Sequence, residues 1–273
     1  MLLDLRPDFA QLYGGDAKVV FARLMAIEGN TYREVQGRST IQFSNSLGSF
    51  FIKIHRGVGW LEILKNIFQF RLPVLSGRNE WLAIRRLEQL GVTTMALVGY
   101  GCKGISPANL RSFVITEEIE NATSLEDLTR DWKSHAPDAW FKYMLIDKVA
   151  HTVSTLHDNG VNHRDLYICH FLLDEAAIGP VPDKEAALHL IDLHRVQIRR
   201  RTPYRWRVKD LAALYFSAMD IGLSRRDRLR FVRIYRRGAL RESLATDRRL
   251  WRDVEKRARR LYRSVWGRPA PDL

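Results

Sequence analysis

Two aspartates in the second half of the chain lie close to the ends of predicted elements. Asp165 closes the tripeptide His163-Arg164-Asp165, just after a predicted helix that ends at Gly160, and Asp192 follows 27 residues later, after the apolar residues 188–191. Acidic side chains that leave neighbouring strand ends can converge on one magnesium–phosphate site, where one orients a hydroxyl and the other holds the metal. The tripeptide alone occurs by chance, so the indication comes from its combination with the second aspartate.

A lysine and a glutamate in the first third of the chain complete this set. Lys53 lies inside the apolar stretch 50–54, and Glu80 lies early in a predicted helix over residues 79–90. A lysine within an apolar strand needs an anionic partner or water, because burying the charge alone is costly. Separately, Lys53 could be a charge at a sheet edge and Glu80 a charge favoured at a helix N-terminus. The order of lysine, glutamate and two aspartates is that of the groups that transfer phosphate from ATP, which favours a kinase.

The elements that must position these residues change along the chain. Up to about residue 120, the pattern predicts strands and one helix; beyond it, helices predominate, with two short strands. We expect strands over 32–43, 49–54, 113–116, 171–173 and 188–191, helices over 79–90, from 124 and over 140–157, and helix throughout from 209 onward. This pattern predicts an α+β protein of two lobes, a β-rich N-terminal lobe over residues 1–118 and a mostly helical C-terminal lobe over residues 119–273.

The composition excludes several other classes of protein. The chain has 273 residues, of which 46% are hydrophobic and 27% are charged, as in globular proteins. There is no apolar run of about 18 residues and no basic region followed by an apolar one at the start, so we expect no transmembrane helix and no signal peptide. The two cysteines, Cys102 and Cys169, lack the spacing of a zinc site or a disulfide framework. Such cysteine usage is typical of proteins in the reducing cytoplasm.

The positive charge gathers in the last third of the chain. The net charge is +13, yet residues 195–268 contain 24 Lys or Arg and only 7 Asp or Glu. Nucleic acid, an anionic membrane or a polyanionic substrate could bind such a surface, which could also simply be solvated. None of the common nucleic-acid-binding patterns is evident, so we expect no nucleic-acid partner.

The motifs together resemble one family of kinases. The chain resembles the lipopolysaccharide core heptose(I) kinase family (the RfaP/WaaP type), which is itself similar to the protein-kinase fold, over about residues 15–237. The matching stretches are 51–57, 72–75, 78–84, 161–165, 167–173, 191–195 and 209–212. The resemblance implies transfer of the ATP γ-phosphate, with Mg²⁺, to a hydroxyl of the first heptose of the lipopolysaccharide inner core. A kinase of small molecules such as aminoglycosides, or of protein tyrosines, remains the alternative.

The resemblance also implies roles for the lysine, the glutamate and the aspartates described above. Asp165 matches the catalytic base, Lys53 the lysine that binds the α- and β-phosphates, Glu80 its helix partner and Asp192 a magnesium ligand. Asp210 matches an aspartate that holds the catalytic loop from below. These assignments would make this chain part of lipopolysaccharide biosynthesis and outer-membrane biogenesis.

Further ATP contacts are expected in two segments of the first lobe. The glycine-rich loop is reduced to one glycine, so Gly37 would be joined in phosphate binding by Arg38 and Ser39. The backbone of residues 116–119, with Glu117 and Ile119, would form the hinge that meets adenine.

The catalytic region departs from protein kinases in two ways. His170 stands where protein kinases have asparagine, and it could bind the metal, contact phosphate, support a ligand or merely pack. Imidazole is a poor substitute for oxygen toward magnesium. No Ala-Pro-Glu motif follows Asp192, which argues against an activation loop and a protein substrate.

The remaining expectations concern binding surfaces. Four arginines after Asp192 would bind the carboxylates and phosphates of the inner core and lipid A, unless they are only solvated: Arg199, Arg200, Arg201 and Arg205. Residues 225–237 would attract the anionic inner-membrane surface. Residues 59–71 are apolar enough to hold an acyl-bearing partner, or they pack on the first lobe. We therefore expect a cytoplasmic protein that is peripheral to the inner membrane.

Overall fold

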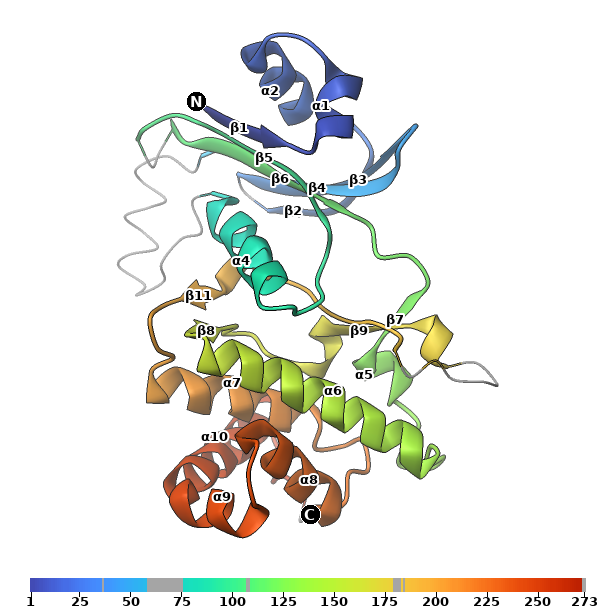
Figure 1. Ribbon diagram of the computed structural model, residues 1–273, viewed down its shortest axis with the longest axis vertical. Helices are drawn as coiled ribbons and strands as arrows, with labels where there is room; N and C mark the ends of the chain where they lie inside the picture. Colours follow the sequence, from blue (N-terminus) through green and yellow to red (C-terminus); the bar gives the residue numbers. More distant parts are fainter. Residues whose placement is uncertain (36, 58–75, 107–108, 179–182, 184, 272–273) are drawn as a thin grey trace. The chain divides into compact units, whose positions relative to one another are not determined.

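The protein forms two compact units. The structure is a computed structural model, and it describes residues 1–35, 37–57, 76–106, 109–178, 183 and 185–271. The first unit comprises residues 1–86, 95–120 and 193–195, and the second comprises residues 87–94, 121–192 and 196–273. The first is built on a β-sheet and the second mainly on helices, which confirms the predicted α+β fold of a β-rich and a helical part (Figure 1).

An antiparallel sheet of six strands is the scaffold of the first unit. Its strands follow the order β1-β5-β6-β4-β3-β2. The strands are β1 (Leu2–Leu5), β2 (Asn30–Val35), β3 (Arg38–Asn45), β4 (Gly48–His55), β5 (Leu97–Lys103) and β6 (Arg111–Glu117). The turn between β3 and β4 leads into Gly48, the first residue of β4, at a φ of 132°, a conformation that glycine adopts without strain.

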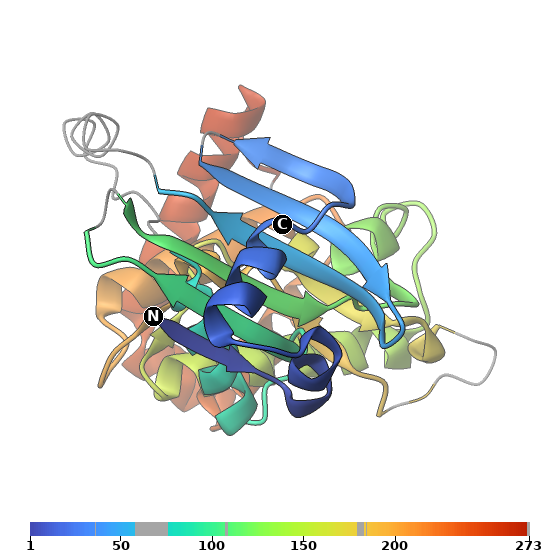
Figure 2. The ribbon, with the colours of Figure 1, turned by 90° about the horizontal axis from the view of Figure 1, so that it is seen from above.

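The period-two pattern of β4 separates its side chains between the two faces of the sheet. Phe50, Ile52 and Ile54 are fully buried and belong to the core on one face. Two short helices, α1 (Pro7–Tyr13) and α2 (Ala17–Met25), cover this face, as Figure 2 shows from above. The sequence analysis predicted neither helix.

Helix α4 (Arg78–Gln89) lies against the other face of the sheet. Trp81 stacks on Tyr100 of β5, with ring centroids 4.7 Å apart. Since Lys53 alternates with the core residues along β4, its side chain projects toward this helix, which contains Glu80.

The second unit is mostly helical. Its helices are α5 (Leu125–Leu128), α6 (Ala139–Asp158), α7 (Tyr204–Ser217), α8 (Arg225–Arg236), α9 (Leu240–Thr246) and α10 (Arg248–Trp266). The predicted helix over 140–157 is confirmed as α6, which begins after Asp138, whose carboxylate accepts hydrogen bonds from two backbone N–H groups of the first turn. Helix α7 starts five residues before the predicted helical region.

Short strands carry the polar loops of this unit. One small sheet has the order β10-β9-β7, and the other pairs β11 with β8. These strands are β7 (Ala122–Ser124), β8 (Val161–Asn162), β9 (Phe171–Asp174), β10 (Leu188–Leu190) and β11 (Gln197–Ile198). A 3₁₀ helix, η2 (Ile168–His170), precedes β9. The described residues also form the 3₁₀ turns η3 (Glu175–Ala177), in this unit, and η4 (Leu193–Arg195), in the first unit. Asp165 therefore follows β8, and Asp192 follows β10.

Candidate active site

Lys53 and Glu80 form an ion pair in the first unit. Nζ of Lys53 lies 2.6 Å from Oε1 of Glu80. The carboxylate side chain is only 2% exposed, whereas the lysine side chain is 27% exposed. The partner that the sequence required for a lysine in an apolar strand is thus present. An ammonium group that is accessible and held by a buried carboxylate can form a charge-assisted hydrogen bond to a phosphate oxygen.

Of the three residues predicted for the phosphate loop, Gly37 lies between β2 and β3, and Arg38 and Ser39 are the first two residues of β3. Gly37 has a φ of 77°, and its carbonyl accepts a hydrogen bond from the backbone N–H of Arg56 at 2.8 Å. The buried hydroxyl of Ser39 accepts a hydrogen bond from the Arg56 guanidinium at 3.1 Å. Burial, and after it the charge of Arg33, lower the pKa of Arg38. The side chain of Ser39 is therefore engaged within the protein.

The expected hinge, residues 116–119, comprises the end of β6 and the two residues after it. The Glu117 carboxylate accepts a hydrogen bond from Arg6 at 2.5 Å, and this contact, after that with Asp8, raises the pKa of Arg6. The next residue, Glu118, accepts hydrogen bonds from Gln42 at 2.7 Å and Ser49 at 2.5 Å. These carboxylates bind the protein itself, so the prediction that the hinge meets adenine depends on its backbone up to Ile119.

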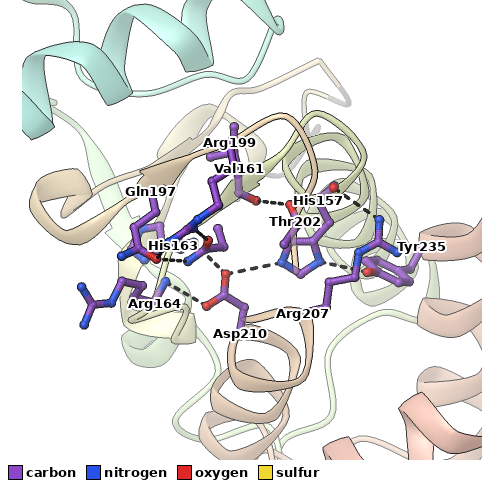
Figure 3. A network of polar contacts seen from close by, with 11 residues as sticks. His157, Val161, His163, Arg164, Gln197, Arg199, Thr202, Arg207, Asp210 and Tyr235 are labelled. Carbon is purple, nitrogen blue, oxygen red and sulfur yellow. Dashed lines mark hydrogen bonds and ion pairs between the residues drawn. The ribbon is translucent and has the colours of Figure 1, made fainter. Parts of the chain in front are cut away.

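In the second unit, Asp210 holds the backbone of the loop that carries Asp165 (Figure 3). Its Oδ2 accepts the backbone N–H of His163 at 2.6 Å, and its Oδ1 accepts that of Arg164 at 2.8 Å. Asp210 is fully buried, and Arg164 has a φ of 78°, which is strained for a residue with a side chain. The two hydrogen bonds hold the backbone of His163 and Arg164, the two residues directly before Asp165 in the chain.

A buried histidine and a tyrosine extend this network to helix α8. Nε2 of His157 lies 3.4 Å from Oδ2 of Asp210, and its Nδ1 lies 2.9 Å from the Tyr235 hydroxyl. A carboxylate only accepts hydrogen bonds, so Nε2 carries the proton, and for the neutral ring Nδ1 accepts from the hydroxyl. Burial raises the pKa of Tyr235 and keeps it an O–H donor. The sequence analysis missed this role for His157, since nothing local links the three residues.

His170 joins the loop of Asp165 to that of Asp192. Its Nδ1 donates a hydrogen bond to the Asp165 carbonyl at 2.7 Å, and its Nε2 lies 3.6 Å from Oδ2 of Asp192. The ring of His170 stacks on that of His163, with centroids 5.8 Å apart. Nε2 of His163 donates to the Ile191 carbonyl at 3.0 Å, and burial lowers the pKa of this histidine. Neutral His163 therefore ties together the segments before Asp165 and Asp192.

The donor set at Asp192 suits a magnesium ion that is shared with a substrate. Its carboxylate is one third exposed, and the residue has a φ of 62°, a strained conformation at a polar loop. Among the described residues, no group of three or more His, Cys, Asp or Glu could enclose a metal. Magnesium is commonly bound by one or two carboxylates, with phosphate oxygens and waters completing the shell, so the residues present fit this ion.

Cys169, next to His170, is not suited to act as a nucleophile. Burial, and after it the charge of Glu126, raises the pKa of this cysteine to about 11. The residue is therefore a thiol at neutral pH, and a thiol is a weak nucleophile.

The four arginines expected at the acceptor have different surroundings. Arg200, Arg201 and Arg205 are exposed. The guanidinium of Arg199 donates hydrogen bonds to Oδ1 of Asn162 and Oε1 of Gln197, both at 2.7 Å. Arg199 is thus held in place by two amides, which are neutral and do not compensate its positive charge.

The other predicted surfaces are described in part. Residues 59–71 lie outside the described residues. In helix α8, Arg225, Arg226 and Arg233 are exposed, whereas Arg236 forms an ion pair with Asp247 at 2.5 Å. No helix within the described ranges is both long and apolar enough to cross a bilayer.

A strand lysine paired with a helix glutamate, together with an anchored His-Arg-Asp loop and a second aspartate after a strand, defines a phosphotransferase of the kinase class. The model of the lipopolysaccharide kinase (Kdo/WaaP) family matches residues 22–235. The chain belongs to this family.

Relatives with assigned names support the same family. The chain is 48% identical over 262 residues to the lipopolysaccharide core heptose(I) kinase WaaP of Pseudomonas aeruginosa, covering 96% of each chain. It is 43% identical over 260 residues to the enzyme of the same name from Escherichia coli K12, covering 95% of this chain and 97% of that one. A solved structure of WaaP in complex with acyl carrier protein is 44% identical, with a TM-score of 0.81, and covers 96% of this chain and all of that one.

These similarities confirm the resemblance that the motifs indicated. A kinase family implies ATP as the phosphate donor, and the names of the relatives support a lipopolysaccharide acceptor rather than a small molecule or a protein tyrosine. The roles of the individual residues stay predictions.

Proposed function

We propose that this chain transfers the γ-phosphate of ATP to a hydroxyl of the first heptose of the lipopolysaccharide inner core. The observation that carries the proposal is the Lys53–Glu80 ion pair, because a lysine held by a buried carboxylate is the recurring phosphate contact of kinases. The shared name of relatives at 48% and 43% identity supports the heptose as acceptor.

The mechanism assigns one task to each anchored side chain. Lys53 binds the α- and β-phosphates through Nζ, and Glu80 keeps that group in place. The Asp165 carboxylate accepts a hydrogen bond from the heptose hydroxyl and takes its proton as the oxygen attacks the γ-phosphorus. A new P–O bond forms to the heptose, the bond to the β-phosphate oxygen breaks, and ADP leaves. Since the transition state is loose, catalysis is mainly a matter of positioning and charge stabilisation.

Asp192 is the proposed magnesium ligand. Its carboxylate supplies the hard oxygen that this ion prefers, and His170 contributes the neighbouring Nε2 while its Nδ1–H stays bonded to the loop. Magnesium, when bound, neutralises charge on the phosphate oxygens.

The remaining site residues divide along the predicted lobes. We assign residues 1–118 to nucleotide binding, including Gly37, Arg38, Ser39 and the backbone at Glu117. The hinge continues to Ile119, where residues 119–273 begin to supply the catalytic and acceptor-binding groups. The acceptor-binding arginines proposed there are Arg199, Arg200, Arg201 and Arg205.

The test is phosphate incorporation by an Asp165→Asn variant. Wild-type protein with Mg-ATP should add one phosphate group to purified core acceptor, as measured by mass spectrometry, and the variant should lose this activity with an unchanged thermal transition. Asp131→Asn, at an exposed aspartate of the same unit, is the matched control. Near-wild-type transfer by the Asp165 variant would end the assignment.

An acyl-bearing partner is a second proposal, favoured by a specific cavity. The helical unit has a partly open cavity of about 490 Å³ lined mostly by apolar side chains, among them Leu145, Ile146, Val149, Leu211 and Leu214. A relative has been solved in complex with acyl carrier protein, and such a cavity could take an acyl chain, each buried CH₂ of which contributes about 0.8 kcal/mol.

The cavity proposal has its own test. Wild-type protein purified with acyl carrier protein should retain a thioester-linked acyl chain, and Leu214→Trp, which fills the cavity, should lose it. Leu244→Trp, at an exposed position of α9, is the control. Equal retention by both variants would exclude this cavity.

We further propose that the enzyme acts in the cytoplasm, at the inner-membrane surface. The exposed Arg225, Arg226 and Arg233 of α8 support electrostatic attraction to anionic lipid. Sedimentation with phosphatidylglycerol vesicles that is lost at high salt and absent with phosphatidylcholine would support it, whereas equal sedimentation with both would contradict it.

A further inference from the structure

Four cationic side chains gather around one indole ring in the second unit. We call this group the Trp206 cluster. It consists of Trp206 with Arg164 at 5.1 Å, Arg199 at 6.0 Å, Arg205 at 5.3 Å and Lys209 at 5.3 Å, each measured from the charged group to the ring centroid. The cations come from three separate segments, namely the catalytic loop, the chain after β11 and helix α7.

The indole of Trp206 attracts the cations through its π-face, not through a hydrogen bond. Nε1 of Trp206 is buried and has no hydrogen-bond partner among the described residues. The negative face of an aromatic ring attracts guanidinium and ammonium groups, which lets several of them share one neighbourhood despite their mutual repulsion. Trp206 is therefore a positioning residue for the cations.

The cluster has positive charge to offer to a ligand. Arg199 is bonded to two neutral amides, and Arg205 is exposed with no carboxylate within ion-pair distance in the described part of the chain. Guanidinium groups with planar, fixed geometry are the side chains best suited to carboxylate and phosphate.

One member of the cluster is the direct neighbour of the proposed catalytic base in the chain. Arg164 directly precedes Asp165, and its backbone N–H is fixed by Oδ1 of Asp210 at 2.8 Å. The same anchored backbone thus determines where the catalytic carboxylate and one cation of the cluster lie.

We propose that the Trp206 cluster is an anion subsite that binds a carboxylate or phosphate of the acceptor, next to the hydroxyl that Asp165 orients. This inference rests on the proposed function and adds to it Arg164, Trp206 and Lys209, which the sequence analysis did not assign to the acceptor. The subsite selects acceptors in which a negative group stands close to the target hydroxyl.

The test combines variants with chemically modified acceptors. Delipidated core oligosaccharide is used unmodified, with its carboxylates converted to methylamides, or with its phosphates removed by hydrofluoric acid. The variants are Arg205→Gln, Trp206→Leu and Trp206→Phe, with Arg257→Gln as the control that removes one exposed charge from α10. Transfer kinetics are measured together with equilibrium binding of the same oligosaccharides by calorimetry.

The expected result is a change in acceptor affinity alone. Arg205→Gln and Trp206→Leu should raise the KM and Kd for unmodified acceptor at least tenfold, with kcat and the KM for ATP within twofold of wild type. Trp206→Phe, which keeps a π-face, should recover most of the affinity. The penalty should vanish on the acceptor that lacks the recognised group, and whether that is the methylamide or the dephosphorylated form identifies carboxylate or phosphate.

Other outcomes overturn the proposal. The subsite is refuted if the penalty is absent, if it persists on both modified acceptors, or if Arg257→Gln reproduces it. If Trp206→Leu fails to fold, the Arg205→Gln variant, at an exposed position, still tests whether the subsite binds the acceptor. Wild-type protein that binds but does not phosphorylate the oligosaccharide would contradict the proposed function, while the binding data would still judge the subsite.

Discussion

Replacing Asp210 should separate the anchoring of the catalytic loop from phosphate binding. This fully buried carboxylate accepts backbone N–H groups from His163 and Arg164 at 2.6 and 2.8 Å. Asp210→Ala removes both acceptors, whereas Asp210→Asn keeps one oxygen and turns an NH₂ group toward the other donor. We expect a graded loss, with the asparagine variant intermediate between wild type and alanine.

The magnitude follows from the unpaired donors. A buried donor left without a partner costs about 1–3 kcal/mol, so the loss of the two backbone hydrogen bonds in Asp210→Ala should lower the free energy of unfolding by roughly 2–6 kcal/mol, to which the longer contact with Nε2 of His157 adds. Asp210→Asn should lower it by about half as much. For chains of this size, each 1 kcal/mol shifts the Tm by about 2–4 °C. Arg164 at a φ of 78° would relax once its hydrogen bond is lost. A displacement of about 1 Å in the neighbouring Asp165 would lower transfer about 10²-fold.

The assay compares turnover and nucleotide binding well below the Tm. Phosphate incorporation should fall in the order wild type, Asp210→Asn, Asp210→Ala, while ATP affinity, which we attribute to Lys53, should change less than threefold. Asp220→Asn is the matched control, because Asp220 also accepts a hydrogen bond, from Tyr262 at 2.8 Å, but is far more exposed. Turnover of Asp210→Asn within twofold of wild type would refute this account of the loop.

Three further predictions concern other parts of the site. Lys53→Met should destabilise the protein more than Glu80→Gln, by about 2 kcal/mol in chemical denaturation, because it leaves a buried carboxylate unpaired while the lysine can reach water; the reverse order would contradict the burial argument. Burial, then the charges of Arg38, Lys53 and His194, lowers the pKa of His55 to about 3, so below pH 6.5 the unfolded state binds a proton that the folded state does not. The free energy of unfolding should therefore fall about 2 kcal/mol more between pH 7 and pH 5 in wild type than in His55→Gln, and equal acid sensitivity of the two proteins would exclude a neutral buried His55. His170→Asn, which offers an amide donor and a harder oxygen ligand, should lower the Mg²⁺ concentration for half-maximal rate, and a raised requirement would argue against His170 near the metal.

The parts of the fold with strong local signals could be predicted from sequence. The apolar spacing over 140–157 and the Asp138 cap belong to one segment, so α6 was evident from its own residues. Helices α1 and α2 were missed because they are short and include Val19, Val20 and Phe21, types common in strands; packing on the Phe9–Phe50 core stabilises them.

The same division holds for the candidate site. The sequence by itself determined the chemistry, because the types and order of Lys53, Glu80, Asp165 and Asp192 state which groups are available to a phosphate and a hydroxyl. The resemblance implied that Glu80 pairs with Lys53 and that Asp210 holds the loop, and the structure has the matching contacts. Only the tertiary structure decided that His157 and Tyr235 extend the Asp210 network and that four cations meet at one indole. The physical reason is that side-chain chemistry is local to each residue, whereas pairing and burial depend on which distant segments the packed core brings into contact.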